Sequence, residues 1–460
     1  MQQNAATVAL DIGKRGSEMQ SWLEMSMASL GQGIAAGEID PIDLAEEYLA
    51  AIESHPLAPR IYARLTKERA RQEAQAASAR AKAGLRRSPL DGVPISWKDL
   101  FDTAAVATEA GSALLAGRRP KADAWALANA TQAGLVCLGK THMSELAFSG
   151  LGLNPITATP PCVNDTAAVA GGSSSGAAAS VAFNLAACGI GSDTGGSVRI
   201  PAAWNDLVGL KTTAGRLPLE GVVPLCESFD TIGPLCRTVE DAALMLAALE
   251  GGQAADLRSA SLAGTRLAVL ETVAFDDLRE EPGQAFENAL EKLAQAGAEI
   301  THIAAPEVSE IMPLSAILFT SEAYGTWQTE IEGAPEKMFP EILARFRSGK
   351  DHGAAEYVAA WRAMARARKI WADRVAGFDA VLLPSAPILP PDAERLLSDS
   401  DYYITENLLS LRNTRIGNLL GLCAITLPTA TPSCGILLMG KAFGEEKLLR
   451  VAAAAEAAMS

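Results

Sequence analysis

An uncharged stretch between Asp165 and Asp193 constrains the fold of this chain more than any other segment. Residues 166–192, TAAVAGGSSSGAAASVAFNLAACGIGS, contain no Asp, Glu, Lys, Arg or His. They are too rich in Gly, Ser and Ala to form a membrane span, yet they lack the charges of a solvated loop or surface helix. The stretch is therefore predicted to be buried backbone that carries several hydroxyl groups.

The serines in and just after this stretch need partners if they are buried. An unpaired polar group inside a protein costs about 1–3 kcal/mol, so each hydroxyl of Ser173, Ser174, Ser175 and Ser197 must find a hydrogen bond. Glycines on both sides allow main-chain N–H groups to come close enough to provide one. This region is the first candidate for a functional site.

Composition and charge narrow the class of protein. Hydrophobic residues make up 49% and charged residues 20% of the 460 residues, as in an ordinary soluble globular protein. The formal net charge of −15 disfavours nucleic acid and anionic membranes as partners and leaves small molecules. The 7 cysteines contain no CxxC pair and the 4 histidines are scattered, so neither disulfides, a metal nor a cofactor is predicted.

The first thirty residues are not expected to form a signal peptide. Charged residues interrupt the first thirty residues, and no later apolar run reaches the length of a membrane span. We expect a cytoplasmic protein with an N-terminal extension over residues 1–24 and one folded domain over residues 25–460. If the chain has a domain boundary, it is expected at GGQAADLRSAS, residues 251–261.

Strand and helix patterns alternate along most of the chain, which predicts an α/β architecture with a largely buried sheet. Asp40-Pro41 is typical of a helix start. Further helices are predicted over residues 66–84, 122–133, 176–187, 238–250, 284–297, 353–376 and 444–458. Buried strands are predicted over residues 135–138, 266–270, 299–303, 380–383, 424–427 and 435–439.

One motif resembles a phosphate-binding loop but has the wrong context. GLVCLGKT at 134–141 matches the pattern GxxxxGK[ST]. A phosphate loop needs a flexible backbone after a strand, whereas residues 135–138 are themselves a predicted strand with buried side chains. Lys140 is therefore interpreted as a structural residue or a pocket edge.

A second motif, GSSSG at 172–176, matches the nucleophile elbow GxSxG centred on Ser174. That serine would need a histidine base from a loop after a strand. His302 and His352 lie in a predicted strand and at a predicted helix start instead. The α/β-hydrolase interpretation is accordingly disfavoured.

Three segments together resemble the amidase signature family: PLDGVPISWKDLFDT at 89–103, GGSSSGAAASVA at 171–182 and GSDTGGSVRIPA at 191–202. The resemblance continues through SFDTIGPLCRTVEDAALML at 228–246 and covers roughly residues 25–458. It implies an α/β fold with a large twisted mixed β-sheet covered by helices on both faces. It also implies a serine hydrolase with a Ser–cis-Ser–Lys triad.

Carried over position by position, the resemblance assigns roles to this chain's residues. Ser197 would be the nucleophile, Ser173 the bridging serine after a cis peptide bond, and Lys98 the base. Backbone N–H groups would bind the oxyanion from Thr194, Gly195, Gly196 and Ser197.

The chemistry of these residue types supports the same roles. A lysine can act as a base only if its ammonium loses a proton near neutral pH, and burial away from charge lowers its pKa in that direction. Ser173 can pass the proton of Ser197 to Lys98 and later deliver it to the leaving nitrogen. Judged singly, Lys98 beside Asp99 is more typical of a surface pair, and residues 173–175 of a helix N-cap. Their joint occurrence favours the triad.

Neighbouring residues are expected to support the oxyanion loop. Asp193 and Arg199 lie on either side of it and are predicted to hold it through hydrogen bonds or an ion pair, with Ser174 in the same supporting role. Ser175 stands where the family most often has glycine, in GGSSSG rather than GGSSGG, and we expect only a local change of the turn.

The substrate pocket is less constrained by sequence. Met143, Phe148 and Leu151 are candidates, together with residues 311–330, although all could equally be core residues. Arg412 and Arg415 could bind a carboxylate or be structural.

We predict an amidase that cleaves a small or aryl amide through a seryl acyl-enzyme, with a small-molecule substrate as partner and a homodimer left open. The alternative is a glutaminase-like subunit of an amidotransferase complex that passes ammonia to a partner. That subunit usually carries a tyrosine-rich stretch where EYVAAWRAMARARKIW has one tyrosine. A non-catalytic binding protein is disfavoured because Lys98 and Ser197 are both present.

Overall fold

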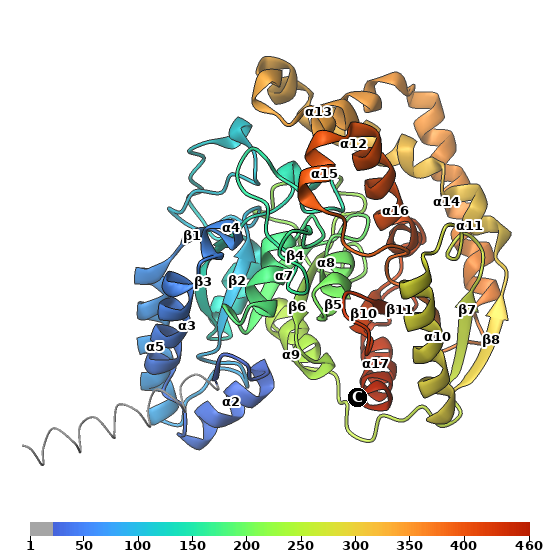
Figure 1. Ribbon diagram of the computed structural model, residues 1–460. Coiled ribbons are helices and arrows are strands. Elements are labelled where there is room, and N and C mark those ends of the chain that lie inside the picture. The colour runs from blue at the N-terminus through green and yellow to red at the C-terminus, as the bar shows by residue number, and fades with distance from the viewer. Residues whose placement is uncertain (1–21) are drawn as a thin grey trace, which may run out of the picture.

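A single mixed sheet organises the molecule. The computed structural model describes residues 22–460, so most of the predicted extension over residues 1–24 lies outside the described part of the chain. The sheet has 11 strands in the order β1-β3-β2-β4-β6-β5-β10-β11-β9-β7-β8. β2 is parallel to β3 and β4, and β7 is parallel to β8 and β9, whereas the other pairs are antiparallel. The predicted α/β fold with a large mixed sheet is confirmed (Figure 1).

The strands are short. They span Tyr62–Leu65 (β1), Pro94–Lys98 (β2), Val136–Thr141 (β3), Cys188–Ser192 (β4), Val208–Lys211 (β5), Ile232–Cys236 (β6), Arg266–Leu270 (β7), Glu299–Ile303 (β8), Ala380–Pro384 (β9), Ala424–Pro428 (β10) and Gly435–Met439 (β11).

The α-helices surround this sheet. They span Met27–Ala36 (α2), Pro41–Ser54 (α3), Ala58–Ile61 (α4), Lys67–Lys82 (α5), Trp125–Gln132 (α6), Ser175–Ala182 (α7), Arg199–Trp204 (α8), Val239–Glu250 (α9), Glu280–Gln295 (α10), Pro306–Ile311 (α11), Leu314–Gly333 (α12), Pro340–Arg347 (α13), Ala354–Arg374 (α14), Ala393–Ser398 (α15), Ser400–Leu419 (α16) and Glu445–Met459 (α17). None of the helices described within residues 22–460 combines the length and the apolarity that crossing a bilayer requires.

Helices cover the sheet along its width. α3 and α5 pack on β3, α7 on β2, β4 and β6, α8 on β5 and β10, and α10 on β9 and β11. In Figure 1, α12, α13, α14 and α16 gather together beyond the central strands, and α13 and α14 pack against α12. This helical cap and the strand ends beneath it enclose the candidate site.

Two secondary-structure predictions need correction. Residues 299–303 form a strand as predicted, but none of the five is buried, because β8 is the last strand of the sheet and pairs only with β7. The helix predicted over residues 176–187 ends at Ala182, and Asn184 then adopts a positive φ of 59° that no α-helix accommodates.

The close approach of β5 and β6 predicts a large effect of one methyl group. A Cβ atom at Gly233 would lie 1.8 Å from the carbonyl oxygen of Leu210. Gly233→Ala should therefore push the strands apart and lower the free energy of unfolding by about 2–4 kcal/mol in a denaturant titration. Gly325→Ala is the matched control on α12, where nothing lies within 4 Å, and should raise it by about 0.5–1 kcal/mol. Equal stabilities of the two variants would contradict the packing argument.

Candidate active site

The site forms where two parallel strands end side by side. β2 and β4 pair in parallel with Trp97 opposite Ile190, so Lys98 and Ser192, their last residues, reach the same edge of the sheet. In open α/β sheets the carboxyl ends of the strands are the usual place for ligands. The strand pairing thus places the buried lysine next to the serine-rich segments.

Lys98 is completely buried and contacts two hydroxyl groups. Its Nζ lies 2.7 Å from Ser173 Oγ and 2.8 Å from Ser192 Oγ. The peptide bond between Gly172 and Ser173 is cis. Burial lowers the pKa of Lys98 to about 7, against the opposing effects of the carboxylates of Asp230 and Asp193. Half of the amine is then uncharged at neutral pH, which is the form that can accept a proton.

The neighbouring acid, Asp99, contacts other side chains than Lys98. It forms ion pairs with Arg64 (2.5 Å) and Lys140 (3.3 Å), not with Lys98. Lys140 is buried in β3 and also donates to the carbonyl oxygen of Phe101 (2.6 Å). The surface-pair interpretation of Lys98 is therefore wrong, and Lys140 is a structural residue within a strand rather than part of a phosphate loop.

Ser197 lies in the turn between β4 and α8, with 4% of its surface exposed. The N–H of Ser174 donates to the carbonyl oxygen of Ser197 (3.2 Å), so the two serine segments lie against each other. Gly196 has a φ of 144°, and a Cβ there would lie 2.1 Å from Thr414 Oγ1. Only glycine fits this turn.

The turn is anchored through side chains and carbonyls. Thr194 Oγ1 donates to Asp230, which also accepts from the N–H of Leu225 (2.9 Å). Thr414 Oγ1 donates to the carbonyl oxygen of Gly195 (2.8 Å). The N–H groups of residues 194–197 donate to no group within residues 22–460. Buried N–H groups are rarely left without an acceptor, so these four are available to an incoming oxygen.

An ion pair fixes the loop from beneath. Asp193 and Arg199 are fully buried and meet through two hydrogen bonds of 2.9 Å. Burial would by itself raise the pKa of Asp193, but the charge and hydrogen bonds of Arg199 hold it well below its usual value. Removing one member of such a pair costs about 3–5 kcal/mol, because the other charge is left buried and alone. The structure thus contains an ion pair between Asp193 and Arg199, and their support of an oxyanion loop stays a prediction.

The hydroxyl groups of the other two serines of the cluster do not cap a helix. Ser174 stands at the start of α7, but its hydroxyl donates to the carbonyl oxygen of Ser192 (3.2 Å) and accepts no hydrogen bond from the helix. The hydroxyl of Ser175 is buried and has no partner within the described residues 22–460. Ser174 is the N-cap residue of α7 by position, and its carbonyl oxygen accepts from the N–H of Ala178 (3.1 Å), but its hydroxyl ties α7 to β4 instead of capping the helix.

A narrow cavity lies beside Ser197. Its volume is about 20 Å³, room for a single water molecule. Of the predicted pocket residues, Phe148 and, from the segment 311–330, Phe319 line it, whereas Met143 and Leu151 are wholly buried in the core. The full lining consists of Ala147, Phe148, Ser149, Thr194, Gly195, Ser197, Leu225, Phe319, Arg345, Leu411 and Arg415. The hydroxyl of Ser174 contacts the backbone of Ser192 and no histidine within residues 22–460, which removes the α/β-hydrolase alternative.

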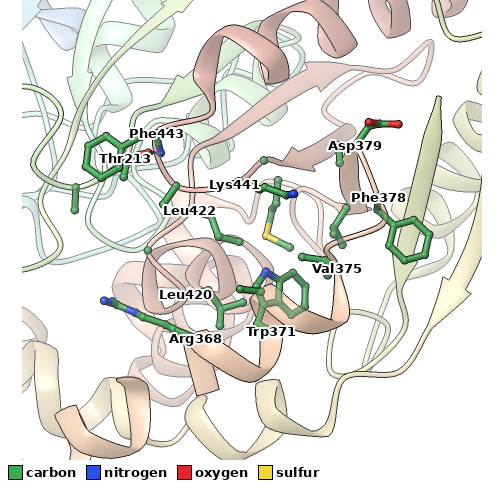
Figure 2. Close-up of a pocket in the computed structure, with 18 of the residues that line it drawn as sticks. Thr213, Arg368, Trp371, Val375, Phe378, Asp379, Leu420, Leu422, Lys441 and Phe443 are labelled. Atoms are coloured by element: carbon green, nitrogen blue, oxygen red, sulfur yellow. Dashed lines mark hydrogen bonds between the residues drawn. The ribbon is translucent and has the colours of Figure 1, made fainter. Parts of the chain in front are cut away.

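A larger cavity of about 560 Å³ lies elsewhere (Figure 2). Figure 2 shows Trp371, Phe378 and Leu422 around it, with Arg368 and Lys441 nearby. None of Lys98, Ser173 or Ser197 contributes to its walls. Its size therefore does not make it the catalytic centre.

Sequence reasoning missed several residues that shape the site. Ser192 is the last residue of the uncharged stretch, and a strand assigned to residues 188–192 would have placed it beside Lys98. Asp230 belongs to the segment 228–246 that carries the resemblance, so its burial could have been suspected. Arg345 had no sequence signal, because it reaches the cavity from the helical cap.

Comparison with known proteins identifies the family of this chain. The family model Amidase matches residues 43–449. The chain is 34% identical to 2-amino-5-chloromuconic acid deaminase of Comamonas testosteroni over 90% of this chain and 91% of that protein. It is 31% identical to one component of the glutamyl-tRNA(Gln) amidotransferase of Roseiflexus sp. (strain RS-1) over 93% of this chain and 95% of that protein.

A solved structure leads to the same family. The native peptide amidase of Stenotrophomonas maltophilia superposes with a TM-score of 0.78 at 28% identity, covering 95% of this chain and 97% of that one. The chain belongs to the amidase signature family and is an amidase that hydrolyses the C–N bond of carboxylic amides.

Proposed function

We propose that Ser197 is the nucleophile of this amidase and that Lys98 activates it through Ser173. The observation that carries this proposal is the 2.7 Å contact between Lys98 Nζ and Ser173 Oγ. The uncharged amine of Lys98 takes the proton of Ser173, and Ser173 takes the proton of Ser197 as the latter attacks the carbonyl carbon. A relay of two hydroxyls and an amine replaces the imidazole of other serine hydrolases.

The turn at residues 194–197 stabilises the negative charge that develops on the carbonyl oxygen. Its four N–H groups have no acceptor within residues 22–460, which supports their role as the oxyanion hole. Collapse of the tetrahedral intermediate expels the amine, which takes its proton from Ser173 while Lys98 returns one to Ser173. Water then attacks the acyl carbon while Ser173 takes its proton and passes one to Lys98, and collapse of the second intermediate releases the acid and returns the proton through Ser173 to Ser197 Oγ.

The proposed substrate is a small or aryl amide. Phe148, Leu225 and Phe319 line the cavity beside Ser197 and supply apolar contacts for such a group. Because the cavity is narrow, these side chains must move to admit a substrate. We further propose that residues 25–460 act as one cytoplasmic catalytic domain, which the single sheet and the 7 buried free cysteines support.

A second candidate function is the transfer of ammonia to a partner protein. It is favoured by the similarity to the amidotransferase component, which extends over almost the whole chain. The two functions differ in whether the isolated chain hydrolyses amides without a partner protein.

We expect the purified chain alone to release ammonia or amine from a panel of aliphatic amides and anilides. A coupled ammonia assay and a chromogenic anilide assay measure this directly. Turnover of glutamine that appears only when a partner protein is added would favour the amidotransferase role, and the Ser197→Ala variant controls for contaminating amidases.

A further inference from the structure

Two arginines reach the cavity beside Ser197 without a counter-ion. Arg345 comes from α13 and Arg415 from α16, and both line the cavity together with the nucleophile. Within residues 22–460 no carboxylate oxygen lies within 4.0 Å of either guanidinium. Both side chains are half-buried, and they differ in this from the fully buried Arg199, which meets the carboxylate of Asp193 and the carbonyl oxygen of Thr414.

Their hydrogen bonds leave donors unused. Arg345 Nη1 donates to the carbonyl oxygen of Phe148 (3.1 Å), and its guanidinium lies 4.4 Å from the centre of the Phe148 ring. Arg415 Nη1 donates only to Ser315 Oγ (3.3 Å), and its Nη2 is buried without a partner. A guanidinium has five N–H donors in a planar fork, so most of the fork of Arg415 is free.

The electrostatics of the pair favour an anion between them. Burial lowers the pKa of Arg415 to about 9, and the positive charge of Arg345 acts in the same direction. Burial also lowers the pKa of Arg345 to about 10. Two half-buried like charges repel each other, and a negative group between them would relieve that repulsion.

The position of the pair fits a ligand that extends from the surface to Ser197. A further cavity of about 300 Å³, here called the outer cavity, lies between α12, α13 and α16. It shares Phe319, Arg345 and Arg415 with the cavity at the nucleophile. The arginines therefore stand at the boundary between the two. A substrate that occupies both spaces would pass directly over their free donors.

Nearby charged residues do not take the place of that anion. Glu341 also lines the outer cavity, where its Oε1 accepts from Ser400 Oγ (2.8 Å) and its Oε2 has no partner within residues 22–460, and it forms no ion pair with Arg345. Arg412, one turn before Arg415 on α16, donates to the carbonyl oxygens of Ala274 and Asp276 and lines neither cavity. Only Arg415 of this sequence pair is available to a ligand.

We propose that Arg345 and Arg415 bind a carboxylate of the substrate, so that this amidase acts on amides which carry a carboxylate a few bonds from the scissile C–N bond. Monoamides of short dicarboxylic acids are the simplest members of this class. A planar guanidinium matches a carboxylate through two parallel hydrogen bonds, which gives orientation as well as affinity. This inference rests on the proposed role of Ser197, because the arginines are placed relative to that residue.

The test compares acid amides with neutral amides of the same length. The ratio of kcat/KM for succinamic or adipamic acid to that for butanamide or hexanamide is measured in wild type, Arg345→Met, Arg415→Met and Arg415→Lys. We expect wild type to prefer the acid amide and Arg415→Met to reduce the ratio about 10- to 100-fold, mainly through KM. Arg415→Lys keeps the charge without the fork and should fall in between.

Arg412→Met is the matched control, from the same helix, and should leave the ratio unchanged. Binding of succinate or adipate to Ser197→Ala, followed by calorimetry, tests the arginines without turnover and should be lost when Arg415→Met is added. Unchanged ratios in Arg345→Met and both Arg415 variants, or equal losses on both substrates, would overturn the inference while leaving the triad intact. Full turnover by Ser197→Ala would instead overturn the proposed nucleophile, whatever the binding data show.

Discussion

Replacing Ser197 with alanine is expected to reduce kcat on any accepted amide by at least about 10,000-fold. The variant keeps the fold and the N–H groups of the turn but has no atom that can form the acyl-enzyme. KM should change little, because the hydroxyl contributes to bond formation rather than to substrate binding. Steady-state assays with a chromogenic anilide, at enzyme concentrations high enough to detect the residual rate, measure the effect.

Ser180→Ala provides a matched control for this variant. Ser180 is as deeply buried as the serines of the site, and its hydroxyl contacts Ser96 Oγ (2.8 Å) and the carbonyl oxygen of Ala177 (2.8 Å). Its loss should lower thermal stability while kcat stays within a few-fold of wild type. A Ser197→Ala protein as active as Ser180→Ala would eliminate Ser197 as the nucleophile.

Lys98→Met is expected to lower kcat by about 100- to 10,000-fold, the range that a positioned general base contributes. Methionine preserves most of the side-chain volume in a fully buried position but cannot accept the proton of Ser173. Single-turnover measurements at saturating substrate separate this loss in the chemical step from any change in binding.

The same lysine predicts the pH dependence of the wild-type enzyme. Since the pKa of Lys98 is lowered to about 7 and only the neutral amine accepts a proton, kcat/KM should rise with pH through about 7 and level off above it. One unit below that pKa, roughly one-tenth of the enzyme is in the active form. The residual activity of Lys98→Met should lack this inflection.

Lys211 tests whether any buried lysine would give the same profile. Burial lowers its pKa to about 8, but its Nζ donates to the carbonyl oxygens of Thr212 and Leu422 and does not contact the serines. Lys211→Met should be less stable yet retain the inflection near pH 7. If the inflection disappeared in Lys211→Met and persisted in Lys98→Met, the titrating group would be Lys211, and the proposed role of Lys98 would be contradicted.

The sequence predicts those strands whose own residues favour a strand. β7, β9, β10 and β11 lie within a residue of their predicted bounds, because AVLL, AITL and similar apolar runs indicate buried strands without further context. β4 and β6 are not predicted, because CGIGS and IGPLC contain glycine or proline, which have low strand propensity. Their extended form depends on pairing with neighbours that lie far away in the sequence.

The site shows the same division between local pattern and tertiary contact. Lys98, Ser173 and Ser197 could be predicted together because three separate segments carry recognisable patterns. The sequence did not reveal that Ser192, like Ser173, contacts the amine of Lys98, since that contact depends on the parallel pairing of β2 and β4. Arg412 and Arg415 look equivalent in the sequence, and only the orientation of α16 shows that one of them faces the cavity.

The covalent intermediate offers the most direct test of the proposed chemistry. An aryl carbamate or activated ester whose acyl-enzyme hydrolyses slowly is mixed with the protein, the reaction is quenched in acid, and the modified peptide is identified by mass spectrometry. We expect one acyl group per chain on Ser197, and none in the Ser197→Ala variant under the same conditions. An acyl group attached to a different residue, still present when Ser197 is alanine, would contradict the assignment of the nucleophile.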